Sequence, residues 1–380
     1  MKKRILVSFY GEVQGYPPTI NMLNVLIEKG FDVILLCRNS DGLPKLINGV
    51  IEIHDVYGSV SIEKQMYGSP LLKTKLYFTF FLNYIKLRII SKPHIILLYD
   101  PIAIVIHAFS VNFFKKRKIW YHNHDILEST NKKMSTNNLL RLIEKKMINR
   151  IDYLTLPALE RLKYFNTKEA NLTFGVIPNF PSKNLFLDFF SNRANCLDDF
   201  HLLFQGSIGE GHGLEQFITV LGWNKSINSH IYLNLKGKIN NDYKSKLISL
   251  AKKKQVNEYL IFHEYTDYSK VPELASKCHL GIAVFTKDDI MNSTLGTASN
   301  KIYEYAATGM PIVYYKNEHF EEHLGQMVWA FGTSLDREEI KEIIRKVKLD
   351  FKKYSLSAYS SFVNQNNFES YANEFVKLIN

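Results

Sequence analysis

The sequence predicts an α/β protein made of two Rossmann-like domains. Strands of buried type alternate with helical segments through the first half, and the alternation starts again near residue 200. The chain has 380 residues, which suits two domains of ordinary size. Repeated strand–helix units favour a parallel sheet in each half, because the connection between neighbouring parallel strands is usually a right-handed helical crossover.

The first half opens with a strand, a helix and a second strand. Arg4–Phe9 is apolar and β-branched, and a glycine-containing loop from Tyr10 to Tyr16 follows. A helix then ends near Gly30, and Asp32–Leu36 forms the next strand. The same reasoning predicts strands at Val50–Ile53, Ile95–Tyr99, Lys118–Tyr121 and Tyr153–Leu156, and helices at Leu139–Asn149 and Ala158–Lys163.

The second half repeats this order of elements. A strand at His201–Gly206 leads through a glycine-rich loop to a helix that begins near Leu214. Further strands are expected at Ile231–Leu235, Tyr259–His263, Leu280–Val284 and Pro311–Tyr314. The predicted domains are residues 1–179 and 180–360, and residues 361–380 carry an amphipathic C-terminal helix.

Composition limits the classes of function. The chain is 46% hydrophobic and 22% charged, as expected for a globular protein. Cys37, Cys196 and Cys278 are too widely spaced to suggest a disulfide or metal framework, which favours a reducing cytosol. The first ten residues lack the long apolar region of a signal peptide.

The net charge of +11 favours an anionic partner, either acidic lipid or nucleic acid. The same charge also fits a biased genome rich in Lys, Asn and Ile codons. No helix-turn-helix, zinc-finger or RNA-recognition signature is present in the sequence, so we expect no nucleic-acid partner.

The most informative segment runs from Ser299 to Val313. Ser299 is a suitable N-cap, Gly309 a suitable residue to end the helix, and the apolar run beyond Pro311 a buried strand. Glu304 is the one charge well inside this helix, among small and aromatic residues. A carboxylate there is placed to hold a sugar hydroxyl; the alternative is an ordinary helix–turn–strand unit with an exposed glutamate.

This segment resembles the signature of GT-B glycosyltransferases, especially the retaining group called family four. In that family a helix of the type Lys-x-x-Glu-Tyr-x-Ala-x-Gly-x-Pro-Val lines the nucleotide-sugar site. The resemblance implies two Rossmann-like domains facing a cleft, with Val176–Asn179 at the linker between them. It also implies that the C-terminal helix crosses back to the N-terminal, acceptor-side domain. Glu304 would hold the donor sugar, and Lys301 its phosphate or sugar.

The resemblance places the donor diphosphate at the loop after residue 205. Gly206, Ser207, Gly211, His212 and Gly213 are the predicted contacts, since glycines let the backbone approach phosphate. The family usually carries an arginine where this chain has Ser207 and a lysine where it has His212. Candidate replacements are His212, Lys236 and Lys301; the alternative is a glycine-rich turn without a ligand.

A second departure concerns the acidic pair of many family members. Their first glutamate would fall at Gly296, so no partner glutamate is assigned to Glu304. Ser299, Asn300 and Lys301 instead resemble a bacterial subset with a Ser/Pro-x-Lys segment before the helix, and all three are predicted donor contacts.

The resemblance also points to His124 and Asp125, which follow a predicted strand. The family often has a His-Asp or His-Glu pair here, with the histidine near the anomeric carbon of the donor. The imidazole of His124 can bond a sugar hydroxyl or the acceptor, with Asp125 orienting it. A metal site at His122, His124 and Asp125, or a purely structural loop, are alternatives; we expect no metal cofactor.

Two further regions are candidates for binding. Tyr265 and Thr266 follow a strand at the point where the family meets the nucleobase, and Tyr265 either stacks on the base or packs internally. The loop with Gly11, Gly15 and Tyr16 either contacts the acceptor or is a flexible surface loop.

The segment Leu71–Arg88 is aromatic and basic. It is too interrupted by charge to span a bilayer, so it is either an interfacial helix or a core helix with snorkelling lysines. Phe113–Lys118 adds a short basic cluster.

Together these observations favour a retaining glycosyltransferase that uses a nucleotide-diphosphate sugar, and UDP- or GDP-linked sugars are the expected donors. The acceptor would be a saccharide or lipid-linked, in bacterial surface-polysaccharide assembly (capsule, lipopolysaccharide or O-antigen). The protein would be cytoplasmic, or peripheral on the inner face of the plasma membrane. The alternatives are a non-catalytic glycosyltransferase-like scaffold and a sugar-nucleotide epimerase of the same fold.

Overall fold

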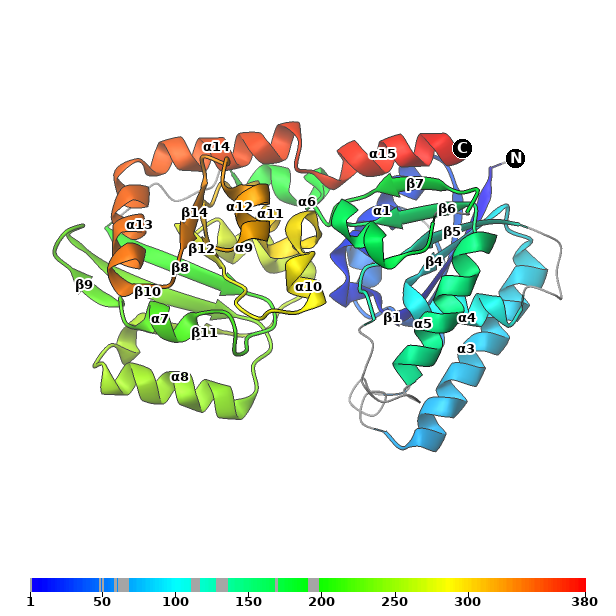
Figure 1. The fold of residues 1–380 in the computed structure, drawn as a ribbon, viewed down its shortest axis with the longest axis horizontal. Coiled ribbons are helices and arrows are strands. Elements are labelled where there is room, and N and C mark those ends of the chain that lie inside the picture. The colour runs from blue at the N-terminus through cyan, green and yellow to red at the C-terminus, as the bar shows by residue number, and fades with distance from the viewer. Residues whose placement is uncertain are drawn as a thin grey trace. The chain divides into compact units, whose positions relative to one another are not determined.

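A computed structural model describes residues 2–47, 49, 51–57, 60, 68–110, 117–127, 136–167, 170–190 and 198–380. The chain forms two compact units (Figure 1). The first comprises residues 1–179 and 368–380, and the second comprises residues 180–367. Cys196 and most of the basic cluster at 113–118 lie outside the described residues.

The first unit is built on a parallel sheet in the order β3-β2-β1-β4-β5-β6-β7. Strands β2 and β3 are added on one side of β1, and β4 to β7 on the other. Open α/β sheets bind ligands at such a switch point, which here lies between β1 and β4. The strands are β1 (Arg4–Glu12), β2 (Asp32–Asn39), β3 (Glu52–Asp55), β4 (Ile95–Tyr99), β5 (Lys118–His122), β6 (Tyr153–Leu156) and β7 (Thr173–Val176).

Helices cover both faces of this sheet (Figure 1). One face packs against α3 (Pro70–Ser91), α4 (Asp100–Ala108) and α5 (Thr136–Met147), because buried residues of these helices form one core with β1, β2, β4 and β5. The helices α1 (Pro17–Glu28) and α15 (Phe368–Ile379) pack together on the other face. Short 3-10 turns are η1 (Val13–Gly15), η2 (Leu43–Lys45), η4 (Ile148–Arg150) and η5 (Leu159–Tyr164).

The position of α15 depends on one glycine. A Cβ atom on Gly175 would lie 2.5 Å from the ring of Phe375, so the absence of a side chain lets the helix reach the sheet. Phe375 also packs against Trp120, with ring centroids 5.2 Å apart. The C-terminal helix is therefore an integral layer of the first unit.

The second unit has a parallel sheet in the order β11-β10-β8-β12-β13-β14, and the short β9 pairs antiparallel with β10. The strands are β8 (Asp199–Gln205), β9 (Gly222–Asn224), β10 (Ser229–Lys236), β11 (Leu260–His263), β12 (Leu280–Ala283), β13 (Ile312–Tyr315) and β14 (Ala330–Thr333).

A core of buried side chains joins one face of this sheet to α7 (Leu214–Ile218), α8 (Asn241–Lys253) and α13 (Arg337–Leu349). Helix α11 (Asn300–Ala307) lies directly on β12, where a Cβ on Gly281 would be 2.3 Å from the ring of Tyr305. The remaining elements are α6 (Lys183–Phe186), η6 (Leu187–Phe189), η7 (Asn257–Tyr259), η8 (Tyr268–Lys270), α9 (Val271–Ala275), α10 (Ile290–Ser293), η9 (Gly296–Ala298), α12 (Glu318–Leu324) and α14 (Phe351–Asn364).

The predicted fold class is confirmed, since both units are α/β with parallel sheets. Two predictions of local structure are corrected. Strand β1 continues to Glu12 through the segment expected to be a loop, and η5 is a 3-10 helix where an α-helix was expected. The strands β7, β9 and β14, which have three or four residues each, were not anticipated. Helix α15 (Phe368–Ile379) lies within the C-terminal segment 361–380, where an amphipathic helix was predicted.

Candidate active site

A buried carboxylate marks the carboxyl edge of the second sheet. Glu304 lies on α11 with 6% of its surface exposed, so it is not the exposed glutamate of the alternative reading. Its Oε2 accepts a hydrogen bond of 3.0 Å from Nε2 of Gln205, the last residue of β8. Burial raises the pKa of Glu304 to about 7, although hydrogen bonds from Tyr268 and Gln205 oppose this shift.

Lys301 lies one turn before Glu304 on the same helix. Its Nζ is 3.6 Å from the ring centroid of Phe204 and 4.9 Å from that of Phe285, which is cation–π geometry. Burial lowers the pKa of Lys301 to about 7, and the charge of Glu304 opposes the shift. The side chain extends over Gly206, because a Cβ there would lie 3.7 Å from its Cε. A desolvated ammonium is thus held above the predicted phosphate loop.

One glycine of this edge, Gly237, has no tolerated replacement. A Cβ on Gly237 would lie 1.8 Å from the carbonyl oxygen of Gly206, and φ at Gly237 is +145°. The ends of β8 and β10 therefore approach more closely than side chains allow. Gly206, Gly211 and Gly213 also adopt positive φ angles. The helix after the loop, α7, has five residues, so its dipole offers little to an anion.

Of the residues expected to supply positive charge at the loop, His212 is neutral, and Lys236 and Lys301 remain as cations. His212 donates from Nδ1 to the carbonyl of Val284 at 2.8 Å, and burial lowers its pKa to about 4, so it is neutral at pH 7. Ser207 is exposed and carries no charge. Lys236 is buried and donates to the carbonyl of Lys270 at 2.9 Å. Lys301 and Lys236 therefore remain as candidate replacements for the missing arginine and lysine.

The residues predicted to meet the nucleobase lie beyond β11. Tyr265 is 54% exposed, with Nζ of Lys238 4.9 Å from its ring centroid. Thr266 Oγ1, Asn300 Oδ1 and Gln205 Oε1 are buried and have no hydrogen-bond partner within the described part of the chain. Buried polar atoms are nearly always hydrogen-bonded, so these three oxygens are candidate contacts for donor groups of a ligand. Ser299 caps α11 as predicted, accepting from the N–H of Ile302 at 3.5 Å.

In the first unit, one carboxylate holds His124 in place. Asp100, 24 residues earlier, accepts the backbone N–H of His124 at 2.7 Å and contacts its Nδ1 at 3.2 Å. Because an ionised carboxylate only accepts, Nδ1 carries the hydrogen and Nε2 the lone pair. Asp100 has φ of +66°, a conformation that non-glycine residues seldom adopt.

Other groups fix the same histidine. The ring of Tyr99 stacks on that of His124, with centroids 4.9 Å apart and planes 8° apart. The guanidinium of Arg161 donates to the carbonyl of His124. Asp125, which the sequence suggested as the orienting residue, is exposed, and the structure gives that role to Asp100.

The neighbouring His122 has a defined tautomer. Trp120 Nε1 donates to Thr155 Oγ1 at 2.7 Å, so the hydroxyl hydrogen of Thr155 is available to His122 Nδ1 at 2.8 Å. Nε2 of His122 therefore carries a hydrogen, and it is buried without a partner among the described residues. Because Nε2 of His122 carries a hydrogen and its Nδ1 accepts one from Thr155, His122 has no free lone pair for a metal ion, and the alternative of a metal site that includes it loses support.

The N-terminal loop partly joins this cluster. Tyr16 lies beside His124, with ring centroids 5.5 Å apart, and precedes α1. Gly11 lies within β1, where a Cβ would be 2.3 Å from the ring of Phe9. Gly15 lies in η1 with open space around its Cα. Of the three residues predicted for the acceptor, Tyr16 is thus adjacent to His124.

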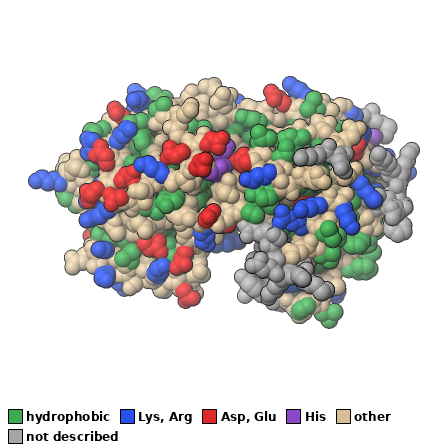
Figure 2. Space-filling view, in the orientation of Figure 1, with side chains coloured by type: hydrophobic (Ala, Val, Ile, Leu, Met, Phe, Trp, Pro, Cys, Tyr) green, Lys and Arg blue, Asp and Glu red, His purple; other side chains and the backbone are tan. Residues whose placement is uncertain are grey.

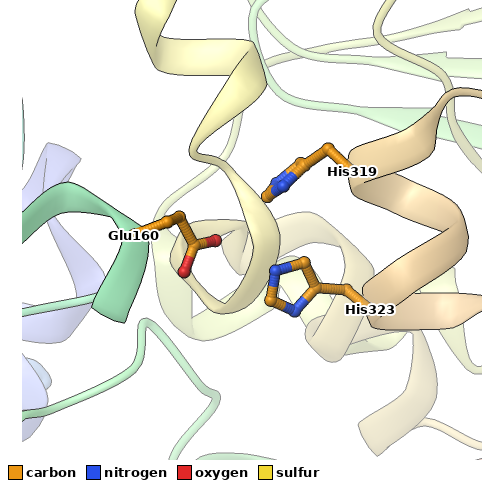
Figure 3. A group of neighbouring side chains, drawn as sticks. All are labelled: Glu160, His319 and His323. Carbon is orange, nitrogen blue, oxygen red and sulfur yellow. The ribbon is translucent and has the colours of Figure 1, made fainter. Parts of the chain in front are cut away.

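A histidine pair lies on α12 of the second unit (Figure 3). His319 and His323 are one turn apart, with ring centroids separated by 4.7 Å. Nε2 of His319 accepts the N–H of Gly296 at 2.9 Å, so its lone pair is already used.

Solved structures resemble this chain over its whole length. Sucrose-phosphate synthase from Thermosynechococcus elongatus matches with a TM-score of 0.72 and 12% identity, covering 100% of this chain and 98% of that chain. HepE from Anabaena, in complex with UDP and glucose, matches with a TM-score of 0.68 and 16% identity, covering 99% of each. WaaG, a glycosyltransferase involved in lipopolysaccharide biosynthesis, matches with a TM-score of 0.63 and 12% identity, covering 99% of each. No family model and no curated protein matches the sequence.

The fold is GT-B. Sequence reasoning about this GT-B protein missed two functional candidates in the first unit, Asp100 and Arg161. Asp100 gave a signal, because it is an acidic residue directly after a buried strand and before Pro101. Arg161 gave none, because nothing in its local pattern predicts that it binds the carbonyl of His124.

A third omission lies at the predicted phosphate loop of the second unit. Lys287 packs against Gly211, where a Cβ would lie 2.9 Å from its Cγ. It is exposed and follows β12, so it adds a cation beside the loop that lacks the family arginine.

Proposed function

We propose that this protein is a retaining glycosyltransferase that takes a sugar from a nucleotide-diphosphate sugar. The observation on which the proposal depends is the buried Glu304. It is hydrogen-bonded to Gln205 at the carboxyl edge of the parallel sheet in the second unit of a GT-B fold. Unpartnered buried oxygens surround the same edge. HepE, which has the same fold, was solved with UDP and glucose. UDP- or GDP-linked sugars are the expected donors.

Each residue has an assigned part in this proposal. Glu304 accepts hydroxyls of the donor sugar, and Lys301 neutralises the diphosphate, which is the leaving group. Tyr265 stacks on the base. His124 is assigned to the reacting sugar or acceptor, with Nε2 able to accept a hydroxyl proton in a hydrogen bond.

In the proposed transfer, the acceptor oxygen forms a bond to the anomeric carbon while the bond from that carbon to the phosphate oxygen breaks. The hydroxyl proton of the acceptor passes to the leaving phosphate on the same face, which retains the configuration. No metal is required in this proposal, because Lys301, Lys236 and Lys287 supply positive charge near the loop. Transfer should therefore persist in the presence of EDTA.

The proposed setting is bacterial surface-polysaccharide assembly at the inner membrane surface, which the similarity to WaaG supports. The structure contains, among its described helices, none that is long and apolar enough to cross a membrane. Helix α3 buries Leu76, Phe80 and Tyr84 in the core, while Phe78 and Leu82 are 60% and 49% exposed. It is thus a core helix with a second, apolar outer face.

A thermal-shift panel of UDP-, GDP-, ADP-, CMP- and dTDP-linked sugars tests the donor site. A ligand that binds only the native state raises the melting temperature by mass action. One nucleotide class should give a shift, and Glu304→Gln should weaken it for the sugar but not for the free nucleotide. Glu322→Gln, an exposed change on α12, is the matched control. The absence of any shift would overturn the proposal.

A non-catalytic scaffold is the second candidate, and the uncharged Ser207 and His212 favour it. Slow hydrolysis of the donor in the absence of acceptor separates the two, since a scaffold produces no free sugar. The same assay would expose an epimerase, which converts the donor into its epimer without any acceptor.

A further inference from the structure

An apolar groove lies on the outside of the first unit. It is formed by α3, α4 and α5 and has a volume of about 580 Å³, within the usual range for sites that bind small molecules. Its walls include Tyr77, Phe78, Phe81, Val105 and Phe109. Phe78 and Phe109 are 60% and 63% exposed, so this is open apolar surface and not part of the core.

One end of the groove meets a polar cluster at the carboxyl edge of the sheet. Tyr77 lines the groove and stacks on Tyr10, with ring centroids 4.7 Å apart and planes 21° apart. Tyr10 is in β1, and the guanidinium carbon of Arg38, from the adjacent β2, is 5.6 Å from its ring centroid. Tyr77 therefore connects the apolar groove to a cation.

Arg38 has capacity for an anionic partner. Its Nε is buried and has no hydrogen-bond partner among the described residues. Burying a charged donor without a hydrogen-bond partner costs free energy, and a ligand that accepts a hydrogen bond from Arg38 would remove this cost. The charge of Arg38 also reaches Tyr16, which lies beside His124, because it lowers the pKa of that phenol against the larger effect of burial.

Helices α3 and α5, which form two walls of the groove, are rich in lysine and arginine. Helix α3 has no acidic residue, and its Lys73, Lys75 and Lys86 are partly or fully exposed. The one acidic residue of α5, Glu144, is buried and accepts a hydrogen bond from Tyr121. In Figure 2 blue and green side chains lie beside one another in patches on the visible face of the first unit. This charge pattern selects an anionic occupant over a neutral one.

We propose that the groove binds the hydrocarbon chain of a lipid phosphate, with Arg38 binding the phosphate at the Tyr10–Tyr77 end. Resting on the proposed function, this assigns the acceptor as a saccharide linked to a lipid through phosphate. The chain lies along Phe78 and Phe109, and the stacked tyrosines mark the boundary between lipid and polar headgroup, as tyrosine does where one end is apolar and the other wet.

Calorimetric titration of the full chain with farnesyl phosphate, farnesol and inorganic phosphate tests the proposal. Farnesyl phosphate should bind at least tenfold more tightly than farnesol, and inorganic phosphate alone should give no measurable binding. Arg38→Gln should weaken farnesyl phosphate at least tenfold, as expected for one lost charge-assisted hydrogen bond, and leave farnesol unchanged. Phe78→Ser should weaken both lipids.

Matched controls lie in the second unit. Arg345→Gln removes an exposed arginine paired with Glu342, and Trp223→Ser removes an aromatic side chain that is 56% exposed. Both variants should bind farnesyl phosphate as the unmodified protein does. Equal affinity for farnesyl phosphate and farnesol, or equal losses in the control variants, would refute the lipid-phosphate site. So would anionic-vesicle binding that Arg38→Gln leaves intact while farnesyl phosphate fails to bind.

The result can be separated from failure of the proposed function. Arg38→Gln should leave the thermal shift with nucleotide sugars unchanged, because Arg38 belongs to the first unit. Lipid binding without any nucleotide-sugar shift would keep the lipid site and remove the acceptor assignment. A nucleotide-sugar shift without selective farnesyl phosphate binding would overturn the lipid site alone.

Discussion

Replacing Asp100 by Asn gives a sharp test of how His124 is held. Asn has nearly the same shape and also tolerates the left-handed backbone seen at φ +66°. Its oxygen can still accept the backbone N–H of His124, now 2.7 Å from Asp100. Its NH₂ group then faces Nδ1, where a carboxylate oxygen lies at 3.2 Å.

The consequence is a change of tautomer. Two donors cannot face each other, so His124 should move its hydrogen from Nδ1 to Nε2 and accept from the amide at Nδ1. Both hydrogen bonds survive, and the free energy of unfolding should fall by less than about 1 kcal/mol. The lone pair at Nε2 is lost. One charge-assisted hydrogen bond, about 1.5–3 kcal/mol, corresponds to a roughly ten- to 150-fold lower kcat.

Two measurements decide the outcome. Side-chain nitrogen NMR of His124 should report hydrogen on Nδ1 in the unmodified protein and on Nε2 in Asp100→Asn. Steady-state kinetics with the identified donor should show the loss mainly in kcat. An unchanged tautomer, or unchanged kcat despite the new tautomer, would refute the reasoning; Asp125→Asn, at an exposed side chain, should change neither.

Three further predictions follow from the second unit. Burial lowers the pKa of Lys301 to about 7, so affinity for UDP-glucose or another bound donor should fall as pH rises through 7, by up to about tenfold per pH unit, and Lys301→Met should flatten the profile. The raised pKa of Glu304, about 7 against an ordinary 4.5, means that the folded state holds its proton more tightly. Its contribution to stability is therefore full below pH 4.5 and lost as pH rises to 7; Glu304→Gln should remove this slope, on the order of 3 kcal/mol, in denaturant titrations at several pH values. Gly237→Ala should destabilise the fold by more than about 3 kcal/mol, because its Cβ would meet the carbonyl of Gly206 at 1.8 Å, whereas Gly15→Ala should change the unfolding free energy by less than about 0.5 kcal/mol. Equal unfolding midpoints for the two alanine variants would contradict the geometric argument.

The sequence was sufficient where local chemistry decides the structure. Ser299 caps α11, and Gly309 ends it with φ of +70°, as the residue types require. Strands with four or more consecutive apolar residues, such as β4, were also found. Strands β7 and β14 were not predicted, because they are short and contain glycine. Pairing with a neighbouring strand, and not composition, makes these segments strands.

The candidate site was less accessible to sequence reasoning. His124 and Glu304 could be proposed from neighbouring residues, but the partner of His124 is 24 positions away, at the start of α4. The charge state of His212 depends on burial and on Val284, which lies 72 positions along the chain. A histidine that substitutes for a lysine by position is therefore not a cation, and only three-dimensional packing reveals this.

The attachment of α15 to the first unit has a consequence for synthesis. The 188 residues of the second unit, 180 to 367, are inserted between the two parts of the first. At about 5–20 residues per second, a ribosome needs roughly 10–40 s to make them. During that interval the ring of Phe375 does not yet cover Trp120 and the surface around Gly175. The nascent first unit therefore presents an open apolar face, suited to chaperone binding, until translation reaches Phe368–Ile379.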